Sequence, residues 1–315
     1  MLSIIVPVYN EELSIVPFWE ALQPVLSLTD MSFEIVFIDD GSTDTTAQMV
    51  RKLSLNQKEV RLIELAKNYG KEAAMTAGMD HSRGDILIPM DVDLQDPPDL
   101  IPLMIEKWRE GYEVVLAKRK TRSGDGLLKR ISASLFYSLL SALSQTTIPK
   151  NVGDYRLMDQ SVVEALKEYR EKNRFMKGIY ADVGFSTTTI EYDRAPRLKG
   201  ETKWNYFKLF RFAFQGIFAF SNFPLRLITG LGFLVSSGAI AYGIWVIIKT
   251  LHYGERVPGY PTMMVVMLFL GGIQLLSLGV IGEYIGMIFK EVKARPIYLI
   301  KRKRSENPTQ GDSNP

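Results

Sequence analysis

The sequence has no cysteine and only two histidines among its 315 residues. A disulfide framework, a thiolate metal site and a cysteine nucleophile are therefore excluded. With only His81 and His252 present, a histidine-rich metal centre is disfavoured as well. The absence of cysteine also leaves the redox compartment of the protein undetermined.

Two nucleotide-binding motifs and an export signal are also missing. No G-x-G-x-x-G follows a predicted strand and no Walker A pattern occurs, which disfavours dinucleotide oxidoreductases and P-loop kinases. Met1 leads directly into the apolar run of residues 2–8, without the basic segment and the cleavage site of a signal peptide. We therefore expect the first domain to remain in the cytoplasm. The net charge of +3 is small, and no nucleic-acid partner is predicted.

The first 120 residues alternate between short apolar runs and segments of helical length. The expected strands are residues 2–8, 33–38, 60–65, 85–90 and 113–117, and helices are expected up to residue 28 and over 44–54, 70–82 and 98–110. This alternation is typical of βαβ units and predicts an α/β domain with a mostly parallel sheet. Gly70, Ala74 and Gly78 are spaced to let their helix lie close to that sheet.

Acidic pairs follow two of the predicted strands. Asp91 and Asp93 stand two residues apart, at a spacing that lets two carboxylates converge on one Mg²⁺ or Mn²⁺ once the strand gives way to a loop. Such a cation would neutralise a diphosphate leaving group. Either Asp39 or Asp40 is a candidate to hydrogen-bond a nucleotide base or ribose. The alternatives are a solvated turn for the first pair and a turn with a helix cap for the second.

A strongly basic loop covers residues 118–130 and contains two glycines. Its position at the binding edge of the sheet favours a lid that closes over phosphates, with arginines that bind them through two hydrogen bonds each. A solvated surface loop, or a contact with anionic lipid, is the alternative.

Two long apolar segments, residues 225–248 and 263–289, are each long enough to span a bilayer. Lysine and arginine are concentrated outside the pair, whereas the link between the segments contains only Lys249 and Arg256. The positive-inside rule then places both chain termini in the cytoplasm. The Phe-rich segment 204–223 suits a helix in the membrane interface, although a core helix of the soluble domain is the alternative.

The predicted organisation therefore has four parts. These are a catalytic domain over residues 1–200, an interfacial amphipathic helix region over 201–223, a two-helix transmembrane hairpin over 224–289, and a basic cytoplasmic tail over 290–315. Gly282 and Gly286 give the second span a smooth face for close helix contact. Homo-oligomerisation through this face and packing within the hairpin both stay open.

Three segments resemble the family-2 (GT-A) inverting glycosyltransferases. The segments are residues 6–11 (VPVYNE), 38–44 (IDDGSTD) and 91–97 (DVDLQDP). Within this family the chain is similar to the dolichol-phosphate mannose synthase branch, and especially to the bactoprenol glucosyltransferases of O-antigen modification clusters. The resemblance covers residue 2 to about residue 300 and implies a Rossmann-like GT-A domain. It also implies transfer from a UDP-sugar to a polyprenyl phosphate at the inner membrane.

The resemblance also implies roles for individual residues. The expected nucleotide-sugar site comprises Pro7, Tyr9, Glu11, Asp39, Asp40, Lys71, Asp91 and Gln95. The expected metal ligands are Asp91, Asp93 and Gln95, and the expected catalytic group is Asp91, Asp93 and Asp154. The expected acceptor-phosphate site comprises Arg119, Arg130, Ser134, Arg194 and Lys203. Many relatives have alanine where Val92 stands, and we expect the Val92 side chain to point back into the sheet.

The chemistry of a phosphate acceptor fits the absence of a catalytic histidine. The second pKa of a phosphate monoester is about 6, so the acceptor is already largely dianionic at neutral pH and needs no strong base. The enzyme must instead align two polyanions and stabilise the departing diphosphate. We therefore interpret Asp154 as a group that orients the sugar or a cation rather than as an obligatory base.

Two other functions are alternatives for this sequence, and the identity of the transferred sugar stays open. A processive polysaccharide synthase would be expected to carry a Gln-x-x-Arg-Trp motif and more membrane spans, and the sequence has neither. A non-catalytic scaffold that binds lipid headgroups is disfavoured by the acidic pairs, which weaken binding to anionic lipid. Glucose is the expected sugar, and N-acetylglucosamine, galactose and aminoarabinose stay open.

Overall fold

The structure is a computed structural model that describes residues 1–120, 152–172, 174, 176–193, 223–253 and 259–301. The chain forms two compact units. The sheet unit comprises Met1–Asp125, Ile148–Thr202 and Pro296–Pro315, and the hairpin unit comprises Gly126–Thr147 and Lys203–Arg295. The predicted interfacial helix region and the residues of the predicted tail beyond residue 301 lie outside the described residues.

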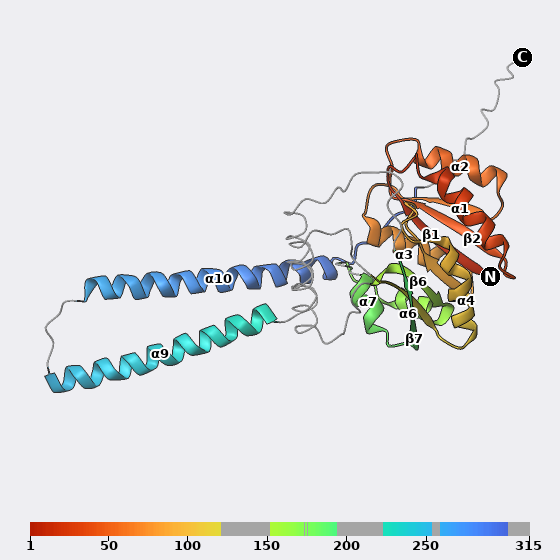
Figure 1. The fold of residues 1–315 in the computed structure, drawn as a ribbon. Coiled ribbons are helices and arrows are strands. Elements are labelled where there is room, and N and C mark those ends of the chain that lie inside the picture. The colour runs from red at the N-terminus through yellow and green to blue at the C-terminus, as the bar shows by residue number, and fades with distance from the viewer. Residues whose placement is uncertain (121–151, 173, 175, 194–222, 254–258, 302–315) are drawn as a thin grey trace, which may run out of the picture. The chain divides into compact units, whose positions relative to one another are not determined.

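The sheet unit contains a seven-stranded sheet in the order β3-β2-β1-β4-β6-β5-β7 (Figure 1). Its strands are β1 (Leu2–Val8), β2 (Phe33–Asp39), β3 (Val60–Glu64), β4 (Ile86–Pro89), β5 (Val114–Arg119), β6 (Val152–Asp159) and β7 (Thr187–Tyr192). Of the seven described strands, only β6 runs antiparallel to its neighbours, β4 and β5. The prediction of a mostly parallel sheet is confirmed, and all five predicted strands are present.

The order of the strands reverses between β1 and β4. The chain moves outward from β1 to β2 and β3, and then returns to place β4 on the other side of β1. In open α/β sheets the crevice for a ligand forms at such a reversal, beyond the carboxyl ends of the strands. The ends of β1, β2 and β4 therefore face the position where a ligand is expected.

Helices cover both faces of the sheet (Figure 1). One face packs against α1 (Ile15–Ser27), α2 (Thr46–Asn56) and α4 (Ile101–Arg109), and the other against α3 (Lys71–His81), α6 (Gln160–Glu168) and α7 (Met176–Asp182). Successive residues of β1 alternate between the faces, since Ile4 joins the first core and Ile5 the second. Burial on both faces explains why the central strands are almost continuously apolar.

Two glycines of α3 serve different purposes. A Cβ on Gly78 would lie only 1.8 Å from Cγ2 of Ile5, so this glycine allows the close approach of helix and sheet that the spacing predicts. Within the described part of the chain, no atom lies within 4 Å of a Cβ on Gly70, which contradicts the same role for it. Its φ of +95° instead explains the glycine, because the chain enters α3 through a left-handed conformation.

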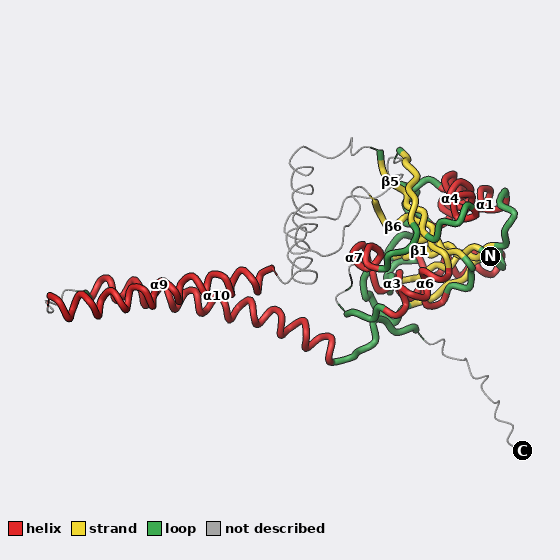
Figure 2. Tube along the Cα trace, turned by 90° about the horizontal axis from the view of Figure 1, so that it is seen from below, coloured by secondary structure: helices red, strands yellow, loops and turns green. Residues whose placement is uncertain are grey.

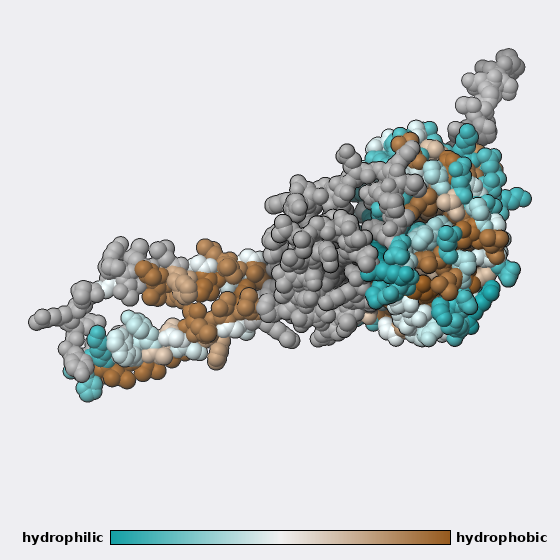
Figure 3. Space-filling view, in the orientation of Figure 1, coloured by the Kyte–Doolittle hydropathy of each residue, from teal (hydrophilic) through white to brown (hydrophobic). Residues whose placement is uncertain are grey.

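The hairpin unit contains two long apolar helices, α9 (Phe223–Tyr253) and α10 (Tyr260–Val292), which run side by side (Figures 1 and 2). Apolar side chains are exposed along both (Figure 3). By length and composition, Leu227–Trp245 and Val265–Val292 are each able to cross a membrane. Among the described residues, no atom lies within 4 Å of a Cβ on Gly282 or Gly286, and the oligomer stays a prediction.

The segment after α10 returns to the sheet unit. Ile300 forms an antiparallel bridge with Leu65, and the N–H of Lys301 donates to the carbonyl oxygen of Glu64 at 2.8 Å. Residues 299–301 therefore lie along β3, the edge strand of the sheet, and satisfy backbone groups that an open edge leaves unpaired. This part of the predicted basic tail is thus an ordered part of the sheet unit.

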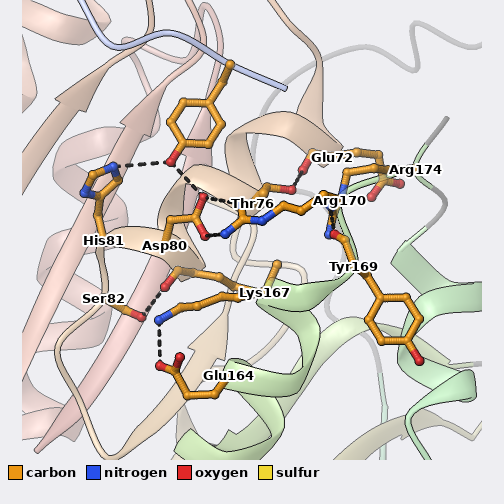
Figure 4. A network of polar contacts seen from close by, with 12 residues as sticks. Glu72, Thr76, Asp80, His81, Ser82, Glu164, Lys167, Tyr169, Arg170 and Arg174 are labelled. Carbon is orange, nitrogen blue, oxygen red and sulfur yellow. Dashed lines mark hydrogen bonds and ion pairs between the residues drawn. The ribbon is translucent and has the colours of Figure 1, made fainter. Parts of the chain in front are cut away.

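A polar network fixes this returning segment (Figure 4). The Tyr298 hydroxyl donates to Oδ2 of Asp80 at 2.8 Å and lies 3.3 Å from Nε2 of His81. The Arg170 guanidinium also donates to both carboxylate oxygens of Asp80, at 2.9 and 3.1 Å. Asp80 therefore joins α3, the residues after α6 and the chain that follows α10.

The first prediction concerns this network. Tyr298→Phe removes the hydrogen bond to Asp80 but keeps the ring, and we expect a loss of about 1 kcal/mol in stability. The thermal midpoint of the purified full chain in detergent should then fall by about 2–4 °C. Tyr112→Phe is the control, because no hydrogen bond of the Tyr112 hydroxyl is found among the described residues. Equal midpoints for the two variants would contradict the contribution of Tyr298.

Candidate active site

A pocket of about 300 Å³ opens at the carboxyl ends of β1, β2 and β4. Its lining consists of Pro7, Val8, Tyr9, Glu11, Asp40, Asn68, Gly70, Lys71, Ala74, Asp91, Val92 and Asp93. Six of the eight residues predicted to bind the nucleotide-sugar are in this set. Asp39 and Gln95 are the other two, and they do not line the pocket. The pocket thus lies where the reversal of strand order predicts a ligand.

Asp39 and Asp40 both order the backbone around the pocket. Asp39 is buried, and its two carboxylate oxygens accept the N–H of Ser42 at 3.2 and 3.3 Å. The Asp40 carboxylate accepts the N–H groups of Tyr69 and Gly70 at 2.7 and 2.8 Å. Burial raises the pKa of both carboxyl groups. These contacts support the turn interpretation of this pair, but the expected helix cap is not found, because α2 begins only at Thr46 and its N-cap residue, Thr45, makes no side-chain cap hydrogen bond. The contact of either residue with a nucleotide stays a prediction.

Lys71 lies between two of the predicted catalytic residues. Its Nζ is 2.6 Å from Oδ1 and 2.9 Å from Oδ2 of Asp91, and 2.9 Å from Oδ2 of Asp154. Partial desolvation of its ammonium group would by itself lower the pKa of Lys71, but the negative charges of Asp91 and Asp154 outweigh this effect and raise the pKa. One ammonium group thus connects residues from the end of β4, from β6 and from the start of α3.

The Asp-x-Asp segment has the orientation that its spacing predicts. Val92 is only 5% exposed and belongs to the hydrophobic core, which confirms that its side chain points back toward the sheet. Leu94 has a φ of +54°, and the N–H of Gln95 donates to Oδ1 of Asp93 at 3.2 Å. The chain therefore turns sharply directly after Asp93, and both Asp91 and Asp93 line the pocket.

The carboxylates of Asp91 and Asp93 fit a divalent cation whose remaining ligands come from a substrate. Among the described residues, no group of three Asp, Glu, His or Cys side chains is arranged to hold a metal by itself. Mg²⁺ commonly binds through one or two carboxylates together with substrate phosphates and water, rather than in an all-protein cage. Asp91 and Asp93 suit this mode, and the ammonium on Asp91 indicates that positive charge is favourable there.

Arg119 is the one predicted acceptor-phosphate residue that the structure describes. Its Nε donates to the hydroxyl of Tyr192 at 3.2 Å, and its guanidinium lies 3.7 Å from Asp96. A Cβ on Gly153 would come within 3.3 Å of the same guanidinium, so Arg119 lies next to the residue that precedes Asp154. The other four residues, Arg130, Ser134, Arg194 and Lys203, lie outside the described part of the chain.

Sequence reasoning did not assign a role to the buried pair of Arg156 and Tyr180. The Arg156 guanidinium carbon lies 3.8 Å from the centroid of the Tyr180 ring, and its NH2 group donates to the carbonyl oxygen of Gly153 at 2.7 Å. Burial lowers the pKa of Arg156. Through its hydrogen bond to Gly153, Arg156 holds the backbone next to Asp154. A buried arginine within a strand is not detected by a search for apolar periodicity.

Comparison with known families matches residues 3–167 to glycosyl transferase family 2 and residues 223–288 to the GtrB C-terminal hairpin. A prophage-derived bactoprenol glucosyl transferase of Shigella flexneri is 48% identical over 307 residues, which cover 98% of this chain and 99% of that protein. A prophage bactoprenol glucosyl transferase homolog of Escherichia coli is 48% identical over 301 residues, covering 96% and 98% of the two chains.

An uncharacterized glycosyltransferase of Synechocystis is similar along the same length. It is 46% identical over 299 residues, which cover 95% of this chain and 94% of that protein. The family match covers the strands from β1 to β6 and the Asp-x-Asp segment, and the hairpin match covers α9 and most of α10. The chain therefore belongs to glycosyl transferase family 2, with a GT-A catalytic unit and a C-terminal helical hairpin.

Proposed function

We propose that this enzyme transfers glucose from UDP-glucose to bactoprenyl (undecaprenyl) phosphate. The similarity to bactoprenol glucosyl transferases, at 48% identity over nearly the whole of both chains, is the observation that carries this proposal. The pocket at the reversal of strand order, with Asp91 and Asp93 at its edge, supports a nucleotide-sugar donor. N-acetylglucosamine, galactose and aminoarabinose are the alternative sugars. A product of this kind would serve O-antigen or other cell-envelope glycosylation.

The reaction needs no proton removed by the protein. An oxygen of the lipid phosphate forms a bond to the anomeric carbon of glucose while the bond from that carbon to the diphosphate breaks, and UDP leaves. Attack opposite the leaving group inverts an α-linked donor to a β-linked product. Because the acceptor is largely dianionic at neutral pH, the residues of the site chiefly position charge.

Each part of the site then has a defined task. Asp91 and Asp93 would hold Mg²⁺ or Mn²⁺, which would supply positive charge to neutralise the departing diphosphate. Arg119, next to Gly153, presents positive charge toward the acceptor phosphate. Asp154, which directly follows the Gly153 carbonyl that accepts a hydrogen bond from Arg156, orients the sugar.

We also propose an arrangement in the membrane. The helices α9 and α10 cross the inner membrane as a hairpin, with the catalytic unit and both termini in the cytoplasm. Support comes from the length and apolar composition of the helices, and from the concentration of lysine and arginine outside the hairpin. A lipid acceptor is then available in the same bilayer as the enzyme.

The second prediction tests the proposed reaction and its cation. Purified full chain, given UDP-[¹⁴C]glucose, undecaprenyl phosphate and Mg²⁺ or Mn²⁺, should transfer label into organic-extractable lipid, and EDTA should abolish the transfer. Asp93→Asn should lower the rate by about 100-fold or more, because the site loses one anionic ligand. Asp99→Asn, at an exposed aspartate outside the pocket, is the control and should retain full activity. Transfer that persists in EDTA, or full activity of Asp93→Asn, would contradict the cation site.

The third prediction separates acceptor binding from donor binding. Arg119→Met should raise the KM for undecaprenyl phosphate by about tenfold, because one charge-assisted contact with phosphate is lost. The KM for UDP-glucose should change little. Arg109→Met, at an exposed arginine at the end of α4, should leave both constants unchanged. If Arg119→Met changed only the KM for UDP-glucose, Arg119 would contact the donor rather than the acceptor phosphate.

A further inference from the structure

The ammonium group of Lys71 has three carboxylate oxygens around it, two from Asp91 and one from Asp154, at 2.6 to 2.9 Å. Oxygen-rich surroundings of this kind are also what a hard divalent cation selects. Asp91 is at the same time one of the two carboxylates that would hold the proposed cation. Lys71 and that cation therefore compete for the same carboxylate.

We propose that Lys71 holds the place of the divalent cation in the donor-free enzyme. In this state it pairs with Asp91 and Asp154, and it releases Asp91 when the cation binds. The freed ammonium then lies beside the pocket, where the diphosphate of the donor brings new negative charge. This inference rests on the proposed function, because it requires the cation site at Asp91 and Asp93.

Repulsion between like charges requires Lys71 to leave Asp91 before a cation can bind there. Both oxygens of Asp91 already face the ammonium group, so a cation bound to either oxygen would come very close to a like charge. Without any cation, Asp91 and Asp154 would instead be two negative charges brought close together at the edge of the sheet. Lys71 removes this repulsion while the site is empty and opposes the cation when it arrives.

The start of α3 holds the backbone of Lys71 in place. Asp40 accepts the N–H groups of Tyr69 and Gly70, which fixes the chain directly before the helix. Gly78 packs tightly against Ile5, and Asp80 is held by Arg170 and Tyr298 at the opposite end of α3. The Lys71 side chain is 42% exposed, so it has room to rotate away from Asp91 without movement of the helix.

Helix stability does not explain a lysine at this position. The N-terminal end of a helix carries partial positive charge, so a cation in its first turn is unfavourable. Lys71 is the first residue of α3, and the two carboxylates that it contacts belong to other elements. Neutral substitutions of Lys71 leave the repulsion between Asp91 and Asp154 uncompensated and should lower the thermal midpoint. The other contacts of α3 should keep the fold, so the proposal is open to a binding experiment.

The test measures Mn²⁺ binding in the absence of donor, by the EPR signal of free Mn²⁺ titrated with purified full chain in detergent. Lys71→Met and Lys71→Gln should each bind Mn²⁺ about tenfold more tightly than the unsubstituted protein, because the competing charge is gone. Lys71→Arg keeps the charge and should bind less tightly than either neutral variant. Lys67→Met removes an exposed cation that does not contact Asp91, and should leave Mn²⁺ affinity unchanged. A single neutral variant that still unfolds in a cooperative thermal transition is sufficient for the comparison.

Transfer kinetics provide a second measurement. Both neutral variants should transfer glucose more slowly in spite of their tighter Mn²⁺ binding, because the freed ammonium no longer faces the diphosphate. Unchanged or weaker Mn²⁺ binding by the neutral variants would overturn the exchange, as would the absence of Mn²⁺ binding in every variant. The proposed function is tested separately by the EDTA assay, so Mn²⁺-dependent transfer with unchanged affinities would reject only the role of Lys71.

Discussion

The ammonium group of Lys71 lies between the carboxylate of Asp91, which follows β4, and the carboxylate of Asp154, which belongs to β6. The arrangement of the rest of the site depends on this contact. The sheet brings Asp91 and Asp154 to one edge although 62 residues separate them in sequence. Two carboxylates at this distance repel each other unless a positive charge lies between them. Lys71 supplies that charge, and Asp40 holds the helix start from which Lys71 extends.

The same contact explains how a site rich in acidic residues can receive two anionic substrates. Positive charge comes from Lys71, from Arg119 at the end of β5 and from the proposed cation. The carboxylates of Asp91, Asp93 and Asp154 determine where this positive charge is held. An enzyme that moves a sugar between two phosphates needs such a pattern more than it needs a base, because its nucleophile is already ionised. The near absence of histidine from the sequence is consistent with this chemistry.

Much of the sheet unit could be predicted from sequence because its central strands are apolar on both faces. Residues of β1 and β2 alternate between two cores, so each strand is an almost continuous apolar run bounded by turn residues. By contrast, β6 carries Gly153, Asp154 and Arg156 within eight residues, and this polar content hides a strand that joins the two halves of the sheet. The resemblance pointed to Asp154, but only the fold brings it to Lys71.

The returning segment could not be predicted for a different reason. Residues 296–301 are too few to produce a clear period, and their partner, β3, lies more than 200 residues earlier in the chain. Long-range pairing of an edge strand leaves almost no local signal. The hairpin helices α9 and α10 lie at the other extreme, since length and composition alone predict both of them.

The most direct test of the account is an experimental structure of the full chain with UDP and Mn²⁺. We expect the cation at about 2.0–2.2 Å from oxygens of Asp91 or Asp93, next to the diphosphate. We also expect that the ammonium of Lys71 has left Asp91 and faces a phosphate oxygen. A cation and diphosphate bound away from both aspartates, with Lys71 still on Asp91, would contradict both the proposed cation site and the proposed role of Lys71.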